Sequence, residues 1–277
     1  MIKCNDRVFR QAVKVMTRLF TEKIISADQK TYTFTGDEAR YLADVLRTQI
    51  GEHICLCDGA WTDITGRIID LTRSAVTVEL IGRVQNDTEP PYKAVMYQAL
   101  VKGDKMDLII QKGVELGVSK IVPVSCIRSI VKLDAKDSVR KIARWQKIAE
   151  EAARQCGRGM VPVIESPLSF AKALEQATEI SDLVFLPWEG EKSRPLSDVL
   201  DKFASELPAA ETGLAEGKAD LPVLSFFIGP EGGFDPKEIS MAQAAGVRTV
   251  TLGRRILRTE TAGLAVLSMF IYRLEQM

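Results

Sequence analysis

The sequence predicts an α/β protein in which a large domain built on a parallel sheet follows a small β-rich domain. Up to about residue 90, short runs alternate apolar and polar residues, as the strands of a small barrel do. Beyond Pro91, continuous apolar runs alternate with helical patterns, which indicates a parallel sheet covered by helices on both faces. The segment Glu89-Pro90-Pro91 is stiff and marks the boundary between the two domains.

The small domain is predicted to span residues 16–90, after an N-terminal extension of residues 1–15. One helix is expected among its strands, because Thr35 and Glu38 have the spacing of a capping box and helical periodicity follows them. The expected strands are 31–34, 53–59, 61–71 and 75–84.

The large domain, residues 91–277, repeats a strand and a helix along its length. One helix start is well marked, because Asp235 can cap it, Pro236 suits its first turn and Glu238 occupies position N3. An acidic loop rich in Ala, Gly and Pro is expected to be mobile at 204–222. The expected strands are 94–101, 120–124, 161–164, 183–187, 223–228 and 250–253. Helices are expected at 104–117, at 138–156, after Pro167, after Pro195, after Asp235 and at the C-terminus.

Composition narrows the class of protein. The chain has 277 residues, of which 46% are hydrophobic and 27% charged, and this balance is typical of a folded globular protein. Neither a secretory signal nor an apolar run of about 20 residues is present, so we expect a cytoplasmic protein without a membrane partner. His53 is the single histidine and the five cysteines are scattered, so we expect no metal site.

The charge is unevenly distributed although the net charge is zero. Residues 91–167 carry 14 basic and 8 acidic side chains, a surplus of 14 − 8 = 6 positive charges. A basic segment attracts polyanions such as nucleic acid. A solvated helix face explains the same surplus without any partner.

A glycine-rich stretch follows one of the predicted buried strands. It reads FIGPEGGF at 227–234, and Gly232 and Gly233 allow a positive φ and a close approach of the backbone to a ligand. Such a loop can hold a nucleotide-like ligand through backbone groups. A tight structural turn is the alternative. The pattern matches neither a P-loop nor the dinucleotide fingerprint.

A second glycine-bearing stretch begins about twenty residues later. It reads LGRRILRTETAG at 252–263 and places three arginines and Glu260 beside a strand end. Thr259 and Thr261 are candidate helix caps, and capping alone can explain part of the pattern. The stretch EEAARQCGRG at 150–159 places Gln155 and Arg158 on one helix face, where an ion-pair ladder is the competing explanation.

Together these motifs resemble a known family. IGPEGGF and LGRRILRTETAGLAVL resemble the signature loops of SPOUT-superfamily methyltransferases, and three further stretches, 40–52, 102–124 and 144–158, are similar to the bacterial 16S ribosomal RNA uridine-N3 methyltransferase family. The resemblance extends from Arg18 to the C-terminus. It implies a PUA-like β-barrel that helps to hold RNA, an α/β domain with a trefoil knot, a pocket for S-adenosylmethionine, and a homodimer.

The resemblance also implies roles for individual residues. Arg258 is the candidate for stabilising a uridinate oxygen, and Glu260 is a possible proton acceptor, although a carboxylate among arginines is a weak base. Gln155 and Arg158 are candidates for contacting the substrate. The expected cofactor contacts are Leu186, Pro187, Trp188, Ile228, Gly229, Pro230, Glu231, Gly232, Gly233, Leu252, Gly253, Arg255, Ile256, Leu257, Thr261 and Ala262. The expected RNA contacts are Arg18, Arg40, Arg47, Arg140, Lys141, Arg144 and Lys147.

The expected reaction is methylation of N3 of a uridine in 16S rRNA, within the assembled small ribosomal subunit. Three other functions remain open at this level: a related methyltransferase with a tRNA target, a non-catalytic RNA-binding protein, and a nucleotide-dependent enzyme. The intact glycine loops argue against the second. The missing P-loop lysine argues against the third.

Overall fold

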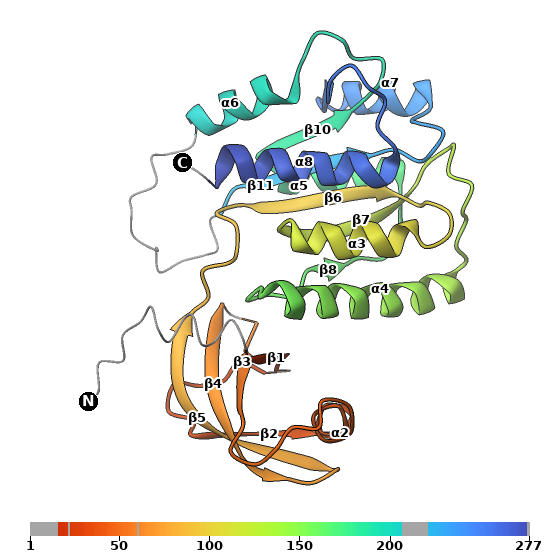
Figure 1. Cartoon of the computed structure of the whole chain (residues 1–277). Coiled ribbons are helices and arrows are strands. Elements are labelled where there is room, and N and C mark those ends of the chain that lie inside the picture. Colours follow the sequence, from red (N-terminus) through yellow and green to blue (C-terminus); the bar gives the residue numbers. More distant parts are fainter. Residues whose placement is uncertain (1–15, 22, 60, 207–220, 276–277) are drawn as a thin grey trace. The chain divides into compact units, whose positions relative to one another are not determined.

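The computed structural model describes residues 16–275 except residues 22, 60 and 207–220, and it divides the chain into two compact units (Figure 1). The smaller unit contains the chain up to Glu89 together with Ala153–Val161, and the larger unit contains Pro90–Ala152 and the chain from Pro162 onward. The predicted extension 1–15 and most of the predicted loop 204–222 lie outside the described residues. Residues 204–206 belong to a helix instead of to a loop.

The smaller unit is a five-stranded sheet that packs around an apolar core. Its strands are β1 (Thr17–Phe20), β2 (Thr31–Thr35), β3 (His53–Cys57), β4 (Thr62–Leu71) and β5 (Ala75–Gln85). They pair in the order β1-β3-β4-β5-β2, and all pairs are antiparallel except β1 with β3. Alternate residues of these strands, among them Phe34, Ile54 and Val78, are buried in one cluster. The strands predicted from alternation are therefore confirmed.

The helix of the smaller unit departs from its predicted start. It consists of α2 (Gly36–Arg40) continued by a π-helical turn, η1 (Tyr41–Val45). Thr35 is the N-cap, but its side chain accepts no capping hydrogen bond within the described part of the chain, so the predicted capping box is wrong. Thr35 has the extended backbone of an N-cap, but Gly36, the first helical residue, has a left-handed φ of 61°, so the first turn departs from the helical geometry on which a capping box depends.

The larger unit is built on a wholly parallel sheet, as the alternation of strands and helices predicts. Its strands are β6 (Lys93–Ala99), β7 (Val118–Ser125), β8 (Val163–Ile164), β9 (Leu168–Ser169), β10 (Leu183–Pro187), β11 (Val223–Ile228) and β12 (Arg248–Val250). They are ordered β12-β10-β11-β6-β7-β8, with β9 also paired to β7. Its helices are α3 (Lys105–Glu115), α4 (Ala135–Cys156), α5 (Phe170–Ile180), α6 (Leu196–Glu206), α7 (Pro236–Ala244) and α8 (Thr259–Leu274). The final residues of α4 belong to the smaller unit.

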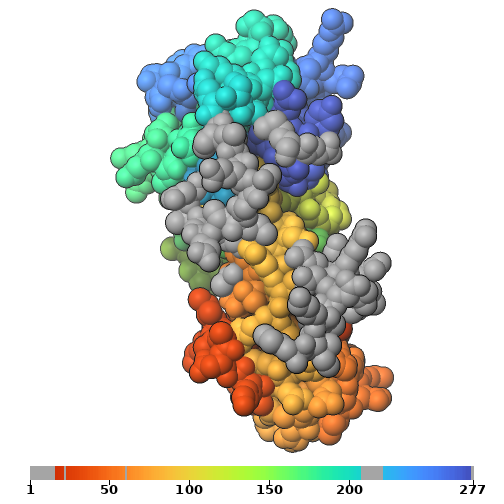
Figure 2. Space-filling model, turned by 90° about the vertical axis from the view of Figure 1, so that its left-hand side faces the viewer, coloured from red at the N-terminus to blue at the C-terminus, as the bar shows by residue number. Residues whose placement is uncertain are grey.

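Helices cover both faces of this sheet. Helices α3, α6 and α8 pack together on one face, while α5 and α7 pack on the other (Figure 1). In Figure 2, which views the molecule from another side, α6 forms part of the outer surface of this unit. Within the described residues, no helix is both long and apolar enough to cross a membrane.

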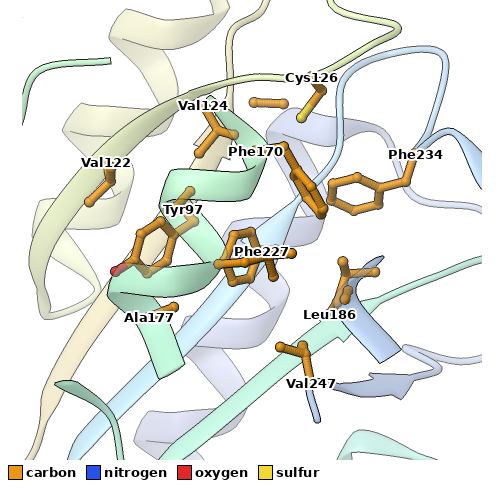
Figure 3. Packing of buried hydrophobic residues seen from close by; sticks show 14 of the residues in the cluster. Tyr97, Val122, Val124, Cys126, Phe170, Ala177, Leu186, Phe227, Phe234 and Val247 are labelled. Carbon is orange, nitrogen blue, oxygen red and sulfur yellow. The ribbon is translucent and has the colours of Figure 1, made fainter. Parts of the chain in front are cut away.

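Two adjacent phenylalanines of β11 show how the central strand is buried on both faces. Phe227 stacks on Tyr97 with ring centroids 4.6 Å apart, and Phe170 of α5 lies edge-on beside it (Figure 3). Phe226 points the other way and meets Phe270 of α8 at 5.7 Å. A strand buried on both sides needs a continuous apolar sequence, which is the pattern that β11 has.

Candidate active site

The pocket lies where three neighbouring parallel strands end. A cavity of about 480 Å³ is lined by residues 187–189 after β10, 228–234 after β11 and 251–258 after β12, with Lys105 and the first turn of α8 completing the wall. Parallel strands direct the loops after their carboxyl ends to one edge of a sheet, and that edge is where such sheets bind ligands. The volume is within the range of small-molecule sites.

The loop after β11 is held by residues outside the motif. Gly233 has a φ of 69°, as predicted, whereas Gly232 lies outside the left-handed region. The Arg128 guanidinium donates a hydrogen bond of 3.1 Å to the carbonyl oxygen of Gly232 and pairs with Asp235 at 3.4 Å. Sequence analysis missed Arg128, because nothing in the β7–α4 connection resembles a motif.

The helix that follows this loop has the predicted start. Asp235 accepts a hydrogen bond from the Lys237 backbone, and Glu238 accepts one from the Asp235 backbone, so the capping box is complete. Glu238 also accepts a hydrogen bond of 2.8 Å from the Ile127 backbone. The cap thus fixes both the helix and the segment that carries Arg128.

The loop after β12 brings positive charge to the pocket. Gly253 has a φ of 111°, which permits the sharp change of direction after β12. Three exposed arginines follow on the pocket wall, Arg254, Arg255 and Arg258. Helix α8 begins here with Arg258 as N-cap, and no side chain caps it within the described chain. The prediction that Thr259 and Thr261 cap this helix is therefore wrong.

Thr259 has a different task from capping. Its hydroxyl donates a hydrogen bond of 2.7 Å to the carbonyl oxygen of Gly229 and accepts one of 3.0 Å from the amide of Gln98. The residue is buried, with 6% of its surface exposed. This one hydroxyl therefore joins three segments that line or support the pocket: the end of β6, the end of β11 and the start of α8.

Two carboxylates from the two glycine loops share one lysine. The Lys105 ammonium lies 3.3 Å from Oε1 of Glu231 and 3.5 Å from Oε2 of Glu260. Burial acts to raise the pKa of Glu231, but hydrogen bonds from its own backbone, from Lys102 and from Lys105, with the charge of Lys105, outweigh burial and lower that pKa. Lys105 is also absent from the residues that sequence analysis selected, although the matched stretch 102–124 contains it.

Comparison with known proteins decides the family. Residues 88–271 match the model of the RNA methyltransferase domain. The chain belongs to this RNA methyltransferase family. Residues 34–81 also match the RNA methyltransferase PUA domain, which agrees with the predicted N-terminal PUA domain.

Individual relatives of this RNA methyltransferase share nearly its whole length. The ribosomal RNA small subunit methyltransferase E of Bacillus subtilis is 33% identical over 94% of this chain and 98% of its own. A crystal structure of the Neisseria gonorrhoeae protein of that name, bound to S-adenosyl methionine, superposes with a TM-score of 0.76 at 30% identity, covering 93% of this chain and 97% of the other. A Legionella pneumophila putative methyltransferase in complex with SAM has a TM-score of 0.77 at 27% identity, with the same coverage.

The structure brings most of the predicted site residues together. All the predicted cofactor contacts except Leu186 and Thr261 line the pocket, as do Arg258 and Glu260. Leu186 is fully buried in the core between the sheet and α5, so the prediction that it contacts a ligand is corrected. Thr261 is exposed outside the pocket wall.

Gln155 and Arg158 belong to the smaller unit. Gln155 is exposed near the end of α4. Arg158 is 4% exposed, and its guanidinium donates to both carboxylate oxygens of Glu89 at 3.1 and 2.6 Å. The same carboxylate accepts hydrogen bonds from the Gly159 and Met160 backbones. Arg158 is thus a structural residue that fixes the segment after α4, which corrects its predicted contact with substrate.

Arg18 is likewise buried and corrects a predicted RNA contact. Its guanidinium donates to both oxygens of Asp63 at 2.6 and 2.8 Å, and it is 9% exposed. Burial opposes the charged form, but the hydrogen bond to Asp63 and the nearby acidic groups raise the pKa of Arg18. Asn86 also donates to Asp63, at 3.0 Å. A shielded ion pair of this kind cannot reach a phosphate.

The thiols of Cys55 and Cys57 adjoin this ion pair. With Asp63 they form a compact group of possible metal ligands. The Arg18 guanidinium occupies the group, however, and a hydrogen bond with Cys55 together with burial raises the pKa of Cys57. A cation is already present and the thiolate form is disfavoured, so the group does not fit a metal.

The other predicted RNA contacts are accessible on their own units. Arg40 and Arg47 are exposed on the smaller unit, and Arg140 and Lys147 are exposed on α4. Arg144 is exposed but paired with Asp107 of α3. Lys141 lies 5.7 Å above the ring of Trp145.

Proposed function

We propose that this chain is a ribosomal RNA methyltransferase that transfers the methyl group of S-adenosylmethionine to N3 of a uridine in 16S rRNA. The observation that carries the proposal is the pocket formed by the loops after β10, β11 and β12. The two relatives crystallised with the cofactor share this chain's fold over nearly its whole length. The relatives named ribosomal RNA small subunit methyltransferase E indicate the substrate class. The uridine N3 target is what the resemblance of the sequence motifs to the uridine-N3 methyltransferase family implies.

The residues of the pocket fit this cofactor. The backbone of residues 228–233 and 252–257 offers N–H and C=O groups to adenine and ribose, which are uncharged and read by hydrogen bonds. Arg254, Arg255 and Lys192 offer positive charge to a carboxylate. S-adenosylmethionine, when bound, supplies an already activated methyl group, so no metal is required.

The chain's own residues then act on the uridine. N3 carries a proton and is a poor nucleophile until the proton is removed. Glu260 accepts this proton, and Arg258 stabilises the charge that develops on an imide oxygen. Holding N3 in line with the methyl group is the third task of the pocket.

Two finer features are part of the proposal. We infer that the segments of the pocket thread through one another as the trefoil knot of the SPOUT superfamily, and that two copies of the chain form a homodimer. The support is membership of the family whose members the motifs resemble. Sedimentation at micromolar concentration distinguishes a dimer from a monomer.

RNA contact is assigned to two regions. The domain of residues 16–90 carries the PUA match and the exposed Arg40 and Arg47, while the domain of residues 91–277 contributes the basic helix. Phosphate contacts position RNA, and the folded shape of the RNA selects the uridine. We expect the substrate to be the assembled small ribosomal subunit, which places the enzyme in the cytoplasm. Replacing Arg140 and Lys147 by Gln should weaken binding and lower the salt dependence by about one unit per lost contact.

One experiment tests the proposed function directly. The protein is incubated with labelled S-adenosylmethionine and small subunits from cells lacking the enzyme, and the labelled nucleotide is mapped. Label at N3 of one 16S uridine is the expected result. Label on another atom, or on tRNA supplied in the same way, would contradict it.

A further inference from the structure

We propose that Lys105 is a catalytic residue whose ammonium group donates a hydrogen bond to an imide oxygen of the target uridine while Glu260 takes the N3 proton. This inference rests on the proposed function and adds a residue to it. Lys105 is the first residue of α3 and lies on the pocket wall. Its side chain is 32% exposed, so a bound base can reach it.

The arrangement of charges around Lys105 is already suited to this task. One ammonium serves two carboxylates, since Nζ is 3.3 Å from Glu231 and 3.5 Å from Glu260. Glu231 is held by a second donor, the backbone N–H of Lys102, at 3.3 Å. Glu231 therefore keeps Lys105 in position even when the interaction with Glu260 weakens.

Glu260 has a buried oxygen that lacks a donor. Its Oε2 atom is inaccessible to solvent and makes no hydrogen bond with any residue in the described ranges, although it lies 3.5 Å from the Lys105 ammonium. A buried carboxylate oxygen without a hydrogen bond is costly, and such atoms are uncommon in folded proteins. The Glu260 side chain as a whole is 18% exposed, so a rotation of its carboxylate towards the pocket lets the N3–H of a uridine supply the missing donor.

The uracil edge complements this pair. The edge presents an N–H flanked by two carbonyl oxygens, so a carboxylate that accepts from N3–H leaves a carbonyl oxygen facing any neighbouring cation. Lys105 is the cation next to the unpaired oxygen. The pair therefore offers one acceptor and one donor side by side, as a uracil imide requires.

The charge shift during the reaction favours Lys105. The N3–H bond breaks and its proton passes to Glu260, leaving negative charge on the uridine imide. The N3 lone pair then forms the bond to the methyl carbon as the bond from that carbon to sulfur breaks, giving N3-methyluridine and S-adenosylhomocysteine, and Glu260 returns its proton to solvent. Glu260 loses its charge in the step that charges the uridine oxygen. The Lys105 ammonium can stabilise first the Glu260 carboxylate and then the charged uridine oxygen without moving far. This is electrostatic stabilisation by a preorganised group.

The test compares Lys105→Met with Lys105→Arg and with a matched control on the same helix. Lys112→Met removes a lysine that is also paired with a glutamate, at 2.8 Å, but lies outside the pocket. Single-turnover methylation of a 16S rRNA substrate should be about a hundredfold slower for K105M. K105R keeps the charge and should lose less than about tenfold, while K112M should match the wild type. Calorimetric affinity for S-adenosylmethionine should stay unchanged in K105M.

A second measurement separates catalysis from a structural role. In small subunits reconstituted with 16S rRNA that was transcribed with 5-fluorouridine, the fluorine makes N3 more acidic, so the uridine anion needs less help from the enzyme. The defect of K105M should fall to about tenfold on this RNA. A lysine that only ties two loops together would give the same defect on both substrates.

The outcomes are distinguishable from failure of the proposed function. If the wild type methylates N3 and K105M does so at the same rate, or is equally impaired on both RNAs, Lys105 is not catalytic and the proposed function stands. If the wild type transfers no methyl group to a uridine N3, both fail.

Discussion

The hydroxyl of Thr259 lies 2.7 Å from the carbonyl oxygen of Gly229 and donates a hydrogen bond to it. Thirty residues separate the two along the chain, and each belongs to a different glycine loop of the pocket. Because Gln98 donates to the same hydroxyl at 3.0 Å, the hydroxyl is satisfied as both donor and acceptor. The two loops thus form one site through a buried contact between them.

Thr259→Val should therefore damage both stability and cofactor binding. Valine keeps the shape but removes the hydroxyl that bonds the Gly229 carbonyl and the Gln98 amide, and the amide keeps only its bond to the Ala99 carbonyl among the described residues. The loss costs about 1–3 kcal/mol of unfolding free energy. Urea unfolding and calorimetry with S-adenosylmethionine measure the two effects. Ser268→Ala is the control, because Ser268 is an exposed residue of the same helix whose hydroxyl donates to the Leu264 carbonyl oxygen one turn before it. Equal behaviour of the two variants would refute a joining role for Thr259.

Gly232→Val should block the cofactor and leave the fold intact. Gly232 does not require a left-handed backbone, and an added Cβ would meet only Arg128 at an ordinary distance of 3.6 Å. The rest of the side chain then occupies the pocket. Calorimetry should show no binding of S-adenosylmethionine, while the melting temperature stays that of the wild type; Gly232→Ala should bind. Undiminished binding by G232V would place the cofactor elsewhere.

Arg258→Ala should slow methyl transfer and spare cofactor binding. Losing one donor that stabilises developing charge costs about two orders of magnitude in rate. The measurement is single-turnover methylation of ribosomal substrate beside calorimetric affinity. Arg273→Ala, which removes an arginine paired with Asp201 at the far end of α8, should leave the rate unchanged. A wild-type rate in R258A would remove Arg258 from the mechanism.

Arg18→Met should unfold the smaller unit readily. The side chains of Arg18 and Asp63 are 7% and 6% exposed, so the variant leaves an unpaired buried carboxylate, at a cost of about 3–5 kcal/mol. Arg67→Met is the matched control: its pair with Glu79 is half exposed, and such pairs contribute about 0–1 kcal/mol. Denaturant unfolding should separate the variants clearly. Similar losses would show that the Arg18 pair is not shielded.

Glu191 should make stability depend on pH in the acid range. Hydrogen bonds from the Ser193 backbone and hydroxyl and from the Thr249 hydroxyl lower the pKa of Glu191 to about 2, from an ordinary 4.5. Between these values the unfolded chain binds the proton more readily, so stability falls as the pH falls. The stability difference between wild type and Glu191→Gln should be full above pH 4.5 and shrink towards pH 2. Urea titrations at several pH values check this, and a difference independent of pH would contradict it.

Local sequence patterns were sufficient to predict most helices and strands of the fold. The predicted strand 223–228 has the same bounds as β11, and the capping box at Asp235 forms as expected. Both depend on interactions between residues that are close together in the sequence, so they can be predicted from residue type and spacing alone. The same holds for the glycine loops, whose position after strands placed them at one edge of the sheet.

Contacts between segments that are far apart in the sequence could be found only in the tertiary structure. Thr35 and Thr259 have the sequence of helix caps, but Gly36 changes the backbone at the first and the Gly229 carbonyl takes the hydroxyl of the second. In the sequence Arg18 and Arg158 resemble surface cations. In the structure both are buried, Arg18 paired with Asp63, 45 residues away, and Arg158 paired with Glu89, 69 residues away. Lys105 and Arg128 belong to no glycine loop, yet they touch both carboxylates and the backbone of the pocket. Residue type and spacing thus determined which chemistry the chain can perform. Only folding decided which charged groups face the pocket, because burial and pairing depend on what the fold brings beside each side chain.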